Sequence, residues 1–177
     1  MRTESEVKLR VASPEAARDA LGRIGAVLVD ERHFEDNLVM DDATSSVVAS
    51  GRLLRLRRTP NRSLLTFKGA VRFEEGVRSR PELEVEVADG GALQGILEAL
   101  GLGVRFRYQK YREAYSWRGL EIVVDETPVG TFFELEGGLA SIHAAAQALG
   151  YAPDDYVTDS YAALFLASGG TGDMVFR

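Results

Sequence analysis

The segment Glu4–Val11 restricts the fold more than any other part of this chain. Its residues alternate between charged and mostly apolar with a period of two, which is the pattern of a β-strand with two different faces. One face would carry Glu4, Glu6, Lys8 and Arg10, and the other Ser5, Val7, Leu9 and Val11. The first face needs water or ionic partners, whereas the second needs a hydrophobic layer to cover it.

Paired glutamates two residues apart recur twice further along the chain, in Glu82–Val87 and in Glu134–Glu136. Each of the three copies leads into a segment with apolar residues at helical spacing, and each of these segments ends at a glycine. The helices predicted in this way cover residues 13–24, 89–100 and 139–149. The chain therefore contains a repeated strand-then-helix unit that carries carboxylates.

The remaining strands are predicted from the same alternation and from turn residues. They cover residues 27–40, 53–57, 64–69, 104–117, 120–125 and 132–136. A short last helix is predicted for residues 159–166. Residues 41–51 are predicted to form a loop, and residues 70–79 a charged connection that acts as a mobile lid.

Composition limits the classes of protein to which the chain can belong. Its 177 residues, 45% of them hydrophobic and 27% charged, predict one globular domain over residues 1–168 and a tail over 169–177. A net charge of −6 argues against a protein that coats duplex DNA or an anionic membrane. The absence of cysteine excludes thiolate chemistry, and two histidines are too few for a histidine metal cluster. No apolar run follows the start of the chain, so we expect a cytoplasmic location without a signal peptide.

Charged side chains occur on one face of most of the predicted strands. They are Glu4, Glu6, Lys8, Arg10, Arg55, Arg57, Lys68, Glu82, Glu84, Lys110, Arg112, Asp125, Glu134 and Glu136. On an open sheet this face would lie in water, which is the usual reason for such a pattern. In a closed barrel the same charges would line a polar interior. Carboxylates there would suit a hard cation such as Mg²⁺ or Mn²⁺, and the basic side chains would suit phosphate.

The motifs and their order resemble those of the CYTH superfamily, the triphosphate tunnel metalloenzymes, which include class IV adenylate cyclases and thiamine triphosphatases. The Glu4–Lys8 segment matches the opening E-x-E-x-K motif. The other matching segments are Leu54–Arg57, Thr66–Gly69, Arg80–Glu84, Lys110–Arg112, Asp125–Thr127, Gly130–Glu136 and Ser160–Tyr161. This resemblance covers nearly the whole chain. It implies an α+β fold in which an eight-stranded antiparallel β-barrel forms a triphosphate tunnel, with helices packed on the outside.

The resemblance also implies roles for individual residues. The divalent cation would be bound by Glu4, Glu6, Glu134 and Glu136, and a second cation would be assisted by Asp125 and by Glu82 or Glu84. The triphosphate would be held by Lys8, Arg55, Arg57, Lys68, Arg80, Lys110 and Arg112. The catalytic set implied by these roles is Glu4, Glu6, Lys8 and Arg57.

Two departures from the family's pattern bear on the activity. Many members carry a tyrosine at the position of Leu38, where it works with the opening lysine. Several bacterial class IV cyclases have His-Phe a few residues before E-x-E-x-K, whereas here only residues 1–3 precede that motif. The second departure favours a triphosphatase over a cyclase.

We therefore expect a Mg²⁺- or Mn²⁺-dependent phosphohydrolase that acts on a triphosphate such as tripolyphosphate, thiamine triphosphate or ATP. A class IV adenylate cyclase, which converts ATP to cyclic AMP and pyrophosphate, is the second candidate. Because Leu38 replaces a catalytic tyrosine, a non-catalytic module that binds polyphosphate or a nucleotide is the third. A structural domain whose charges are all solvated is the fourth. Neither nucleic acid nor a membrane is expected as a partner, and the preferred cation and the oligomeric state stay open.

Overall fold

The computed structural model describes residues 2–177 of the chain. The strands are β1 (Arg2–Val11), β2 (Val27–Asp41), β3 (Leu53–Arg58), β4 (Ser63–Lys68), β5 (Arg72–Glu74), β6 (Val77–Val87), β7 (Gly103–Trp117), β8 (Leu120–Thr127), β9 (Gly130–Glu136) and β10 (Tyr156–Val157). The helices are α1 (Pro14–Ile24), α2 (Ser46–Ala49), α3 (Gly90–Ala99), α4 (Leu139–Ala148) and α5 (Tyr161–Ala167), with a 3-10 turn η1 (Pro153–Asp155). Within this part of the chain, no helix combines the length and the apolar character that a membrane crossing requires.

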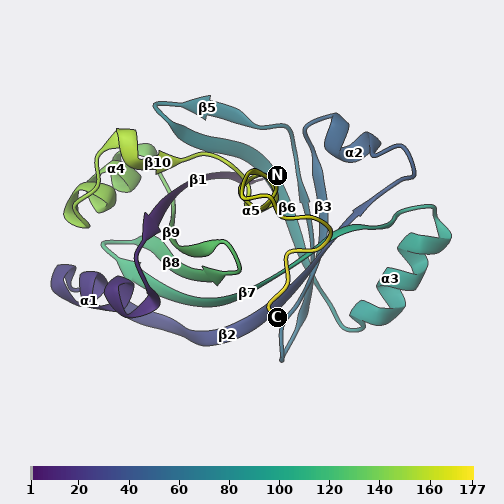
Figure 1. The fold of residues 1–177 in the computed structure, drawn as a ribbon, viewed down its shortest axis with the longest axis horizontal. Helices are drawn as coiled ribbons and strands as arrows, with labels where there is room; N and C mark the ends of the chain where they lie inside the picture. Colours follow the sequence, from purple (N-terminus) through teal and green to yellow (C-terminus); the bar gives the residue numbers. More distant parts are fainter. Residues whose placement is uncertain (1) are drawn as a thin grey trace.

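Among the described residues, eight strands close into an antiparallel barrel. Their order is β1-β9-β8-β7-β2-β3-β4-β6, and β6 pairs back with β1. The short strands β5 and β10 extend the sheet beside β6 and β1. Figure 1 shows the ring of strands, with α1 and α4 on one side of it and α2 and α3 on the other. The predicted fold class is confirmed.

The outer face of β1 packs under α1 and α4. Val7 and Leu9 are 1% and 0% exposed, and they belong to the same core cluster as Leu21 of α1 and Ile142 of α4. Helix α1 begins where predicted, because the Ser13 side chain accepts a hydrogen bond from a backbone N–H of the first turn. This packing turns the alternate residues of β1, the charged ones, towards the barrel interior.

Helix α3 covers the outer face of β2 and β3. There Leu38, Met40 and Leu56 form a second buried cluster with Leu97 of the helix. Leu38 was expected at the position of a tunnel tyrosine, but the structure places it in this outer layer. The residue at position 38 therefore takes no direct part in the tunnel of this protein.

Residues 70–79, predicted to be a charged connection that acts as a mobile lid, belong mostly to strands. These residues contain the hairpin between β5 and β6, whose turn has positive φ angles at Glu75 (49°) and Gly76 (78°). Strand β6 begins at the fully buried Val77 and pairs with β1, so Arg78 lies directly opposite Glu6. The segment contains mixed charges and a glycine and lacks a regular alternation, so the sequence did not predict that strand β6 begins within it. The predicted loop 41–51 likewise contains the short helix α2.

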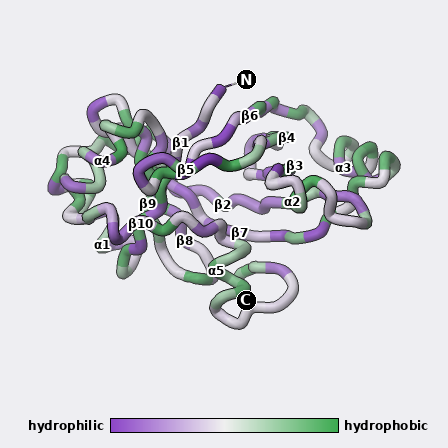
Figure 2. The backbone as a smooth tube through the Cα atoms, turned by 90° about the horizontal axis from the view of Figure 1, so that it is seen from above, coloured by the Kyte–Doolittle hydropathy of each residue, from purple (hydrophilic) through white to green (hydrophobic). Residues whose placement is uncertain are grey.

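Helix α5 and the residues after it close one end of the barrel. Figure 2, turned by 90° from Figure 1, shows α5 and the C-terminus together beyond β7 and β8. Tyr161 of α5 and Met174 pack against Phe132 of β9 in a third cluster. The backbone of Met174 exchanges two hydrogen bonds of 2.9 Å with β7, one with the Gln109 N–H and one with the Arg107 carbonyl. The segment predicted as a tail is therefore packed against the barrel.

Replacing Met174 by alanine is expected to lower the free energy of unfolding by about 2–5 kcal/mol, because its 0%-exposed side chain would leave a cavity. Urea denaturation measures this loss. The control is Leu100→Ala, which removes a side chain that is 73% exposed and should change stability by less than about 0.5 kcal/mol. Equal stability of the two variants would show that the C-terminal segment does not pack as described.

Candidate functional site

A cavity of about 1400 Å³ runs through the barrel interior. It is lined by all but one of the site residues that the sequence predicts: Glu4, Glu6, Lys8, Arg55, Arg57, Lys68, Arg80, Glu82, Glu84, Lys110, Arg112, Glu134 and Glu136. The remaining residue, Asp125, is 0% exposed and lies beneath this lining. Charged side chains from six strands therefore line one cavity, because the alternate residues of each strand face the interior once the barrel closes.

The strand register explains how residues distant in sequence meet in this cavity. In the antiparallel ladder between β1 and β9, Glu6 lies opposite Glu136, and Lys8 lies opposite Glu134. Directly opposite residues point to the same face of a sheet. The paired glutamates of the first and third repeats therefore share one wall of the tunnel.

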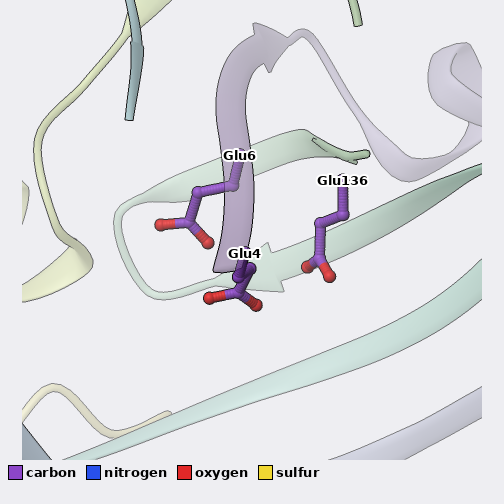
Figure 3. A group of neighbouring side chains, drawn as sticks. All are labelled: Glu4, Glu6 and Glu136. Carbon is purple, nitrogen blue, oxygen red and sulfur yellow. The ribbon is translucent and has the colours of Figure 1, made fainter. Parts of the chain in front are cut away.

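Three carboxylates on this wall converge. Ligand oxygens of Glu4, Glu6 and Glu136 all lie within 4.8 Å of one another. Figure 3 shows their side chains, two from β1 and one from the end of β9, directed towards a common space. Hard oxygen donors at this spacing suit Mg²⁺ or Mn²⁺, which are commonly held by a few carboxylates together with phosphate oxygens of a substrate. We name these three residues the carboxylate cluster.

The carboxylate cluster holds a proton when no cation is bound. Burial raises the pKa of Glu136 to about 8. The negative charges of Glu134, Glu4 and Glu6 also raise this pKa, and together with burial they outweigh Arg112, which lowers it. Burial also tends to raise the pKa of Glu6, but Lys8, Lys68 and Arg80 prevail and lower it to about 2. At neutral pH the cluster therefore contains an ionised Glu6 beside a protonated Glu136.

Cation affinity is expected to rise by up to about tenfold per pH unit between pH 6 and pH 8, because a bound cation must displace the proton of Glu136. Above pH 8 the affinity should level off. Titration of Mn²⁺ into the protein at several pH values measures this slope. In Glu136→Gln the affinity should be lower and its pH dependence shallower, whereas an unchanged slope would place the titrating group elsewhere.

Two of the predicted cation ligands lie outside the carboxylate cluster and pair with basic side chains. Asp125 accepts two hydrogen bonds of 2.7 Å from Arg112, one of 2.8 Å from Lys110 and one of 2.8 Å from the Tyr161 hydroxyl. Glu134 pairs with Arg112 and, at 3.3 Å, with Lys8. With these charges satisfied inside the protein, Asp125 and Glu134 hold the basic residues in place.

The other predicted acidic residues lie on β6 and also have partners. Glu82 lies 2.7 Å from the Lys68 ammonium group, which also pairs with Glu4. Glu84 accepts a 2.7 Å hydrogen bond from the Thr66 hydroxyl. The structure therefore brings Glu4, Glu6 and Glu136 together, and it leaves Glu82 and Glu84 outside that group.

Several basic groups in the tunnel have unused hydrogen-bonding capacity. The Nε atoms of Arg55, Arg57 and Arg80 are buried and have no partner among the described residues. Burial lowers the pKa of Arg80, and the positive charge of Arg78 lowers it further. The Arg80 guanidinium therefore has too little negative charge around it to neutralise its own. Arginine donors of this kind are suited to phosphate oxygens.

Sequence reasoning missed three residues on the inner faces of β2 and β7. Glu35 is 1% exposed and accepts a 3.2 Å hydrogen bond from Arg57. Asn37 is fully buried, with both polar atoms of its amide unpartnered. The Tyr108 hydroxyl oxygen accepts a 3.0 Å hydrogen bond from Arg55. Register shifts early in β2 interrupt its alternation, and for this reason the sequence alone did not show which residues of this strand face inwards.

Comparison with known proteins relates this tunnel to a described family. The family model for the CYTH domain matches residues 2–161. A protein of Methanocaldococcus jannaschii, provisionally named an adenylate cyclase, is 23% identical over 141 residues, which are 79% of each chain.

Solved structures share the fold of this chain. A Vibrio parahaemolyticus protein, provisionally named an adenylate cyclase, superposes with a TM-score of 0.81 at 21% identity, over 93% of this chain and 98% of its own. A Hippeastrum protein, provisionally named an adenylyl cyclase and described as having a dominant triphosphatase activity, superposes with a TM-score of 0.68 at 21% identity, over 95% and 97% of the two chains. At these identities the likeness establishes the architecture.

Proposed function

The chain belongs to the CYTH domain family, and from that premise we propose that it is a divalent-cation-dependent phosphohydrolase that acts on triphosphates. One observation carries the proposal: the same cavity is lined by the carboxylate cluster and by arginines whose Nε atoms have no hydrogen-bond partner among the described residues. A cation would neutralise the carboxylate cluster, and a polyanion would accept hydrogen bonds from the arginines. The Hippeastrum relative, described as a triphosphatase, supports the choice of reaction.

The carboxylate cluster would hold Mg²⁺ or Mn²⁺. When bound, the ion would supply positive charge against the phosphate oxygens of the substrate. Arg55, Arg57 and Arg80 would donate hydrogen bonds to the phosphate chain through their unused N–H groups. Together these groups would stabilise the charge that develops on the leaving phosphate while water attacks the transferred one.

Lys8 would act as a fixed cation and not as a base. Burial alone would lower its pKa, but Glu6 at 3.6 Å and Glu134 at 3.3 Å outweigh that effect and raise it. The ammonium group therefore keeps its protons at neutral pH and can donate them in hydrogen bonds to phosphate oxygens. Because Leu38 lies outside the tunnel, no tyrosine at that position is available to take a proton from Lys8.

A class IV adenylate cyclase is the second candidate function. The names given to the relatives from Methanocaldococcus jannaschii and Vibrio parahaemolyticus favour it. Cyclisation requires the ribose 3′ hydroxyl to be positioned against the α-phosphate, whereas hydrolysis requires only a placed water molecule. Hydrolysis therefore makes the smaller demand on the geometry of this tunnel.

Product analysis tests the proposal. The protein should release inorganic phosphate from at least one of tripolyphosphate, thiamine triphosphate and ATP in the presence of Mg²⁺ or Mn²⁺, and a chelator should stop the release. Cyclic AMP as the main product, without phosphate release, would establish the cyclase instead. Tight cation-dependent binding of all three compounds without turnover would establish a non-catalytic binding module.

A further inference from the structure

Four buried polar atoms on the inner faces of β2 and β3 have no hydrogen-bond partner among the described residues. They are the Glu35 Oε2, both polar atoms of the Asn37 amide and the Arg57 Nε. Buried polar atoms without partners destabilise a fold, because each atom gives up its contact with water and receives nothing in exchange. Four such atoms on three residues indicate an arrangement that is completed only in another state of the protein.

The strand register places these three residues side by side on the tunnel wall. Asn37 of β2 lies directly opposite Arg57 of β3, and Glu35 points to the same face of β2 two residues earlier. Directly opposite residues in an antiparallel pair have Cβ atoms about 4.5–5.5 Å apart. One contact is already made, because the Arg57 Nη1 donates a 3.2 Å hydrogen bond to the Glu35 Oε1. We name Glu35, Asn37 and Arg57 the anchor group.

The unpaired atoms of the anchor group match in kind as well as in position. The Arg57 Nε and the Asn37 amide nitrogen are donors, whereas the Asn37 amide oxygen and the Glu35 Oε2 are acceptors. A bond from the Arg57 Nε to the Asn37 oxygen and another from the Asn37 nitrogen to Glu35 would pair all four atoms. With the existing bond from Arg57 to Glu35, they would close a ring that fixes the plane of the guanidinium.

Glu35 provides a charged acceptor for this ring. Burial tends to raise the pKa of Glu35, but Lys110 and Arg57 prevail and lower it well below its usual range. The Lys110 ammonium group lies 3.6 Å from the same Oε2 atom that has no hydrogen-bond partner. The carboxylate is therefore ionised at neutral pH, and hydrogen bonds to an ionised acceptor are stronger than those between neutral groups.

Only one member of the anchor group reaches the ligand cavity. Arg57 lines the cavity, whereas Glu35 and Asn37 are 1% and 0% exposed and are not part of its lining. Asn37 can therefore act on a phosphate group only through Arg57. A guanidinium that is held from behind presents its remaining N–H groups to the cavity in a fixed orientation, and it loses less conformational freedom on binding.

We propose that Asn37 is a positioning residue for phosphate binding, which links Arg57 to Glu35 and holds the guanidinium in the plane that receives a phosphate group. This link is open in the ligand-free protein, and it closes when a bound phosphate draws the guanidinium into its working orientation. The inference rests on the proposed function and deepens it, because it requires the tunnel to bind a triphosphate. An ordered water molecule shared by the same four atoms is the competing explanation, in which Asn37 has a structural role alone.

Asn37→Leu tests the proposal, because leucine has a similar size and no polar atoms. The dissociation constant of imidotriphosphate, measured by calorimetry in the presence of Mn²⁺, should rise about tenfold, the effect of losing one hydrogen bond to a charged group. The thermal midpoint of the ligand-free variant should not fall, since the deleted atoms have no partner in that state. Asn61→Leu is the control, because the only other asparagine is exposed in the turn between β3 and β4 and should alter neither quantity.

A double-mutant cycle with Arg57→Met identifies the route of the effect. Arg57→Met alone should weaken binding of the analogue, and adding Asn37→Leu should weaken it no further, because Asn37 acts only through Arg57. Additive losses would place the action of Asn37 elsewhere and overturn the inference. A lower thermal midpoint of Asn37→Leu with an unchanged dissociation constant would also overturn it, since this is the result expected for a structural water site.

The inference and the proposed reaction can fail separately, because binding of a non-hydrolysable analogue is measured without turnover. Wild-type protein that binds the analogue but hydrolyses no triphosphate would contradict the reaction, and the cycle would still decide the role of Asn37. Wild-type protein that does not bind the analogue would overturn both.

Discussion

Arg112→Met should lower the free energy of unfolding by about 3–5 kcal/mol, the largest stability change expected for a single substitution in the tunnel. Arg112 donates two hydrogen bonds to Asp125 and pairs with Glu134 in the barrel interior. Removing the guanidinium would leave these carboxylates, 0% and 5% exposed, with only part of their neutralising charge. Buried ions that lose a partner are strongly destabilised, because water cannot replace it.

Denaturant unfolding of matched variants would measure this effect. Arg72→Met makes the same change at an exposed position of β5 and should alter stability by less than about 0.5 kcal/mol. Arg112→Lys should fall between the two, because an ammonium group cannot bridge both carboxylates as a guanidinium does. If Arg112→Met were as stable as Arg72→Met, the interior network would not be an ionised one.

Glu6→Gln should reduce kcat/KM for a triphosphate by about 10²–10³-fold, a loss typical of removing one electrostatic contact to the transition state. The substitution keeps the shape of the side chain and removes one negative charge from the carboxylate cluster. Cation binding should weaken with it, because an amide oxygen is a poorer ligand than a carboxylate for a hard cation. The fold should be retained, since the change is isosteric.

Glu74→Gln makes the same chemical change on the exposed strand β5 and should leave both activity and cation affinity unaltered. Measuring Mn²⁺ affinity beside kcat/KM separates a lost cation from a lost substrate contact. Activity of Glu6→Gln within tenfold of the wild type, with normal cation affinity, would mean that the cation binds at another place.

The alternation of charged and apolar residues predicted which side chains share the charged face of most strands, whereas the closed barrel was implied by the family resemblance and is confirmed by the structure. Val7 and Leu9 need an outer layer, so Glu6 and Lys8 must face inwards once the sheet closes. The pattern could not show which charges pair across the tunnel. Glu134 and Glu136 look alike in sequence, yet one neutralises basic residues and the other joins the carboxylate cluster.

Other features depend on three-dimensional packing that no periodic pattern records. The bulges of β2 shift its register, so the inward position of Glu35 could not be read from alternation. Leu38 was expected at the place of a family tyrosine, and only its packing against α3 shows that this side chain lies outside the tunnel. Met174 follows a glycine-rich stretch without periodicity, and its burial depends on the cluster with Phe132.

The central claim is that one cation and one triphosphate meet inside the barrel. It is tested most directly by anomalous diffraction from crystals that contain Mn²⁺ and imidotriphosphate, a non-hydrolysable analogue of tripolyphosphate. The account predicts a manganese peak bounded by the carboxylates of Glu4, Glu6 and Glu136, in contact with a phosphate chain that extends towards Arg55 and Arg80. Manganese bound only on the outer surface, or an analogue absent from the tunnel, would contradict it.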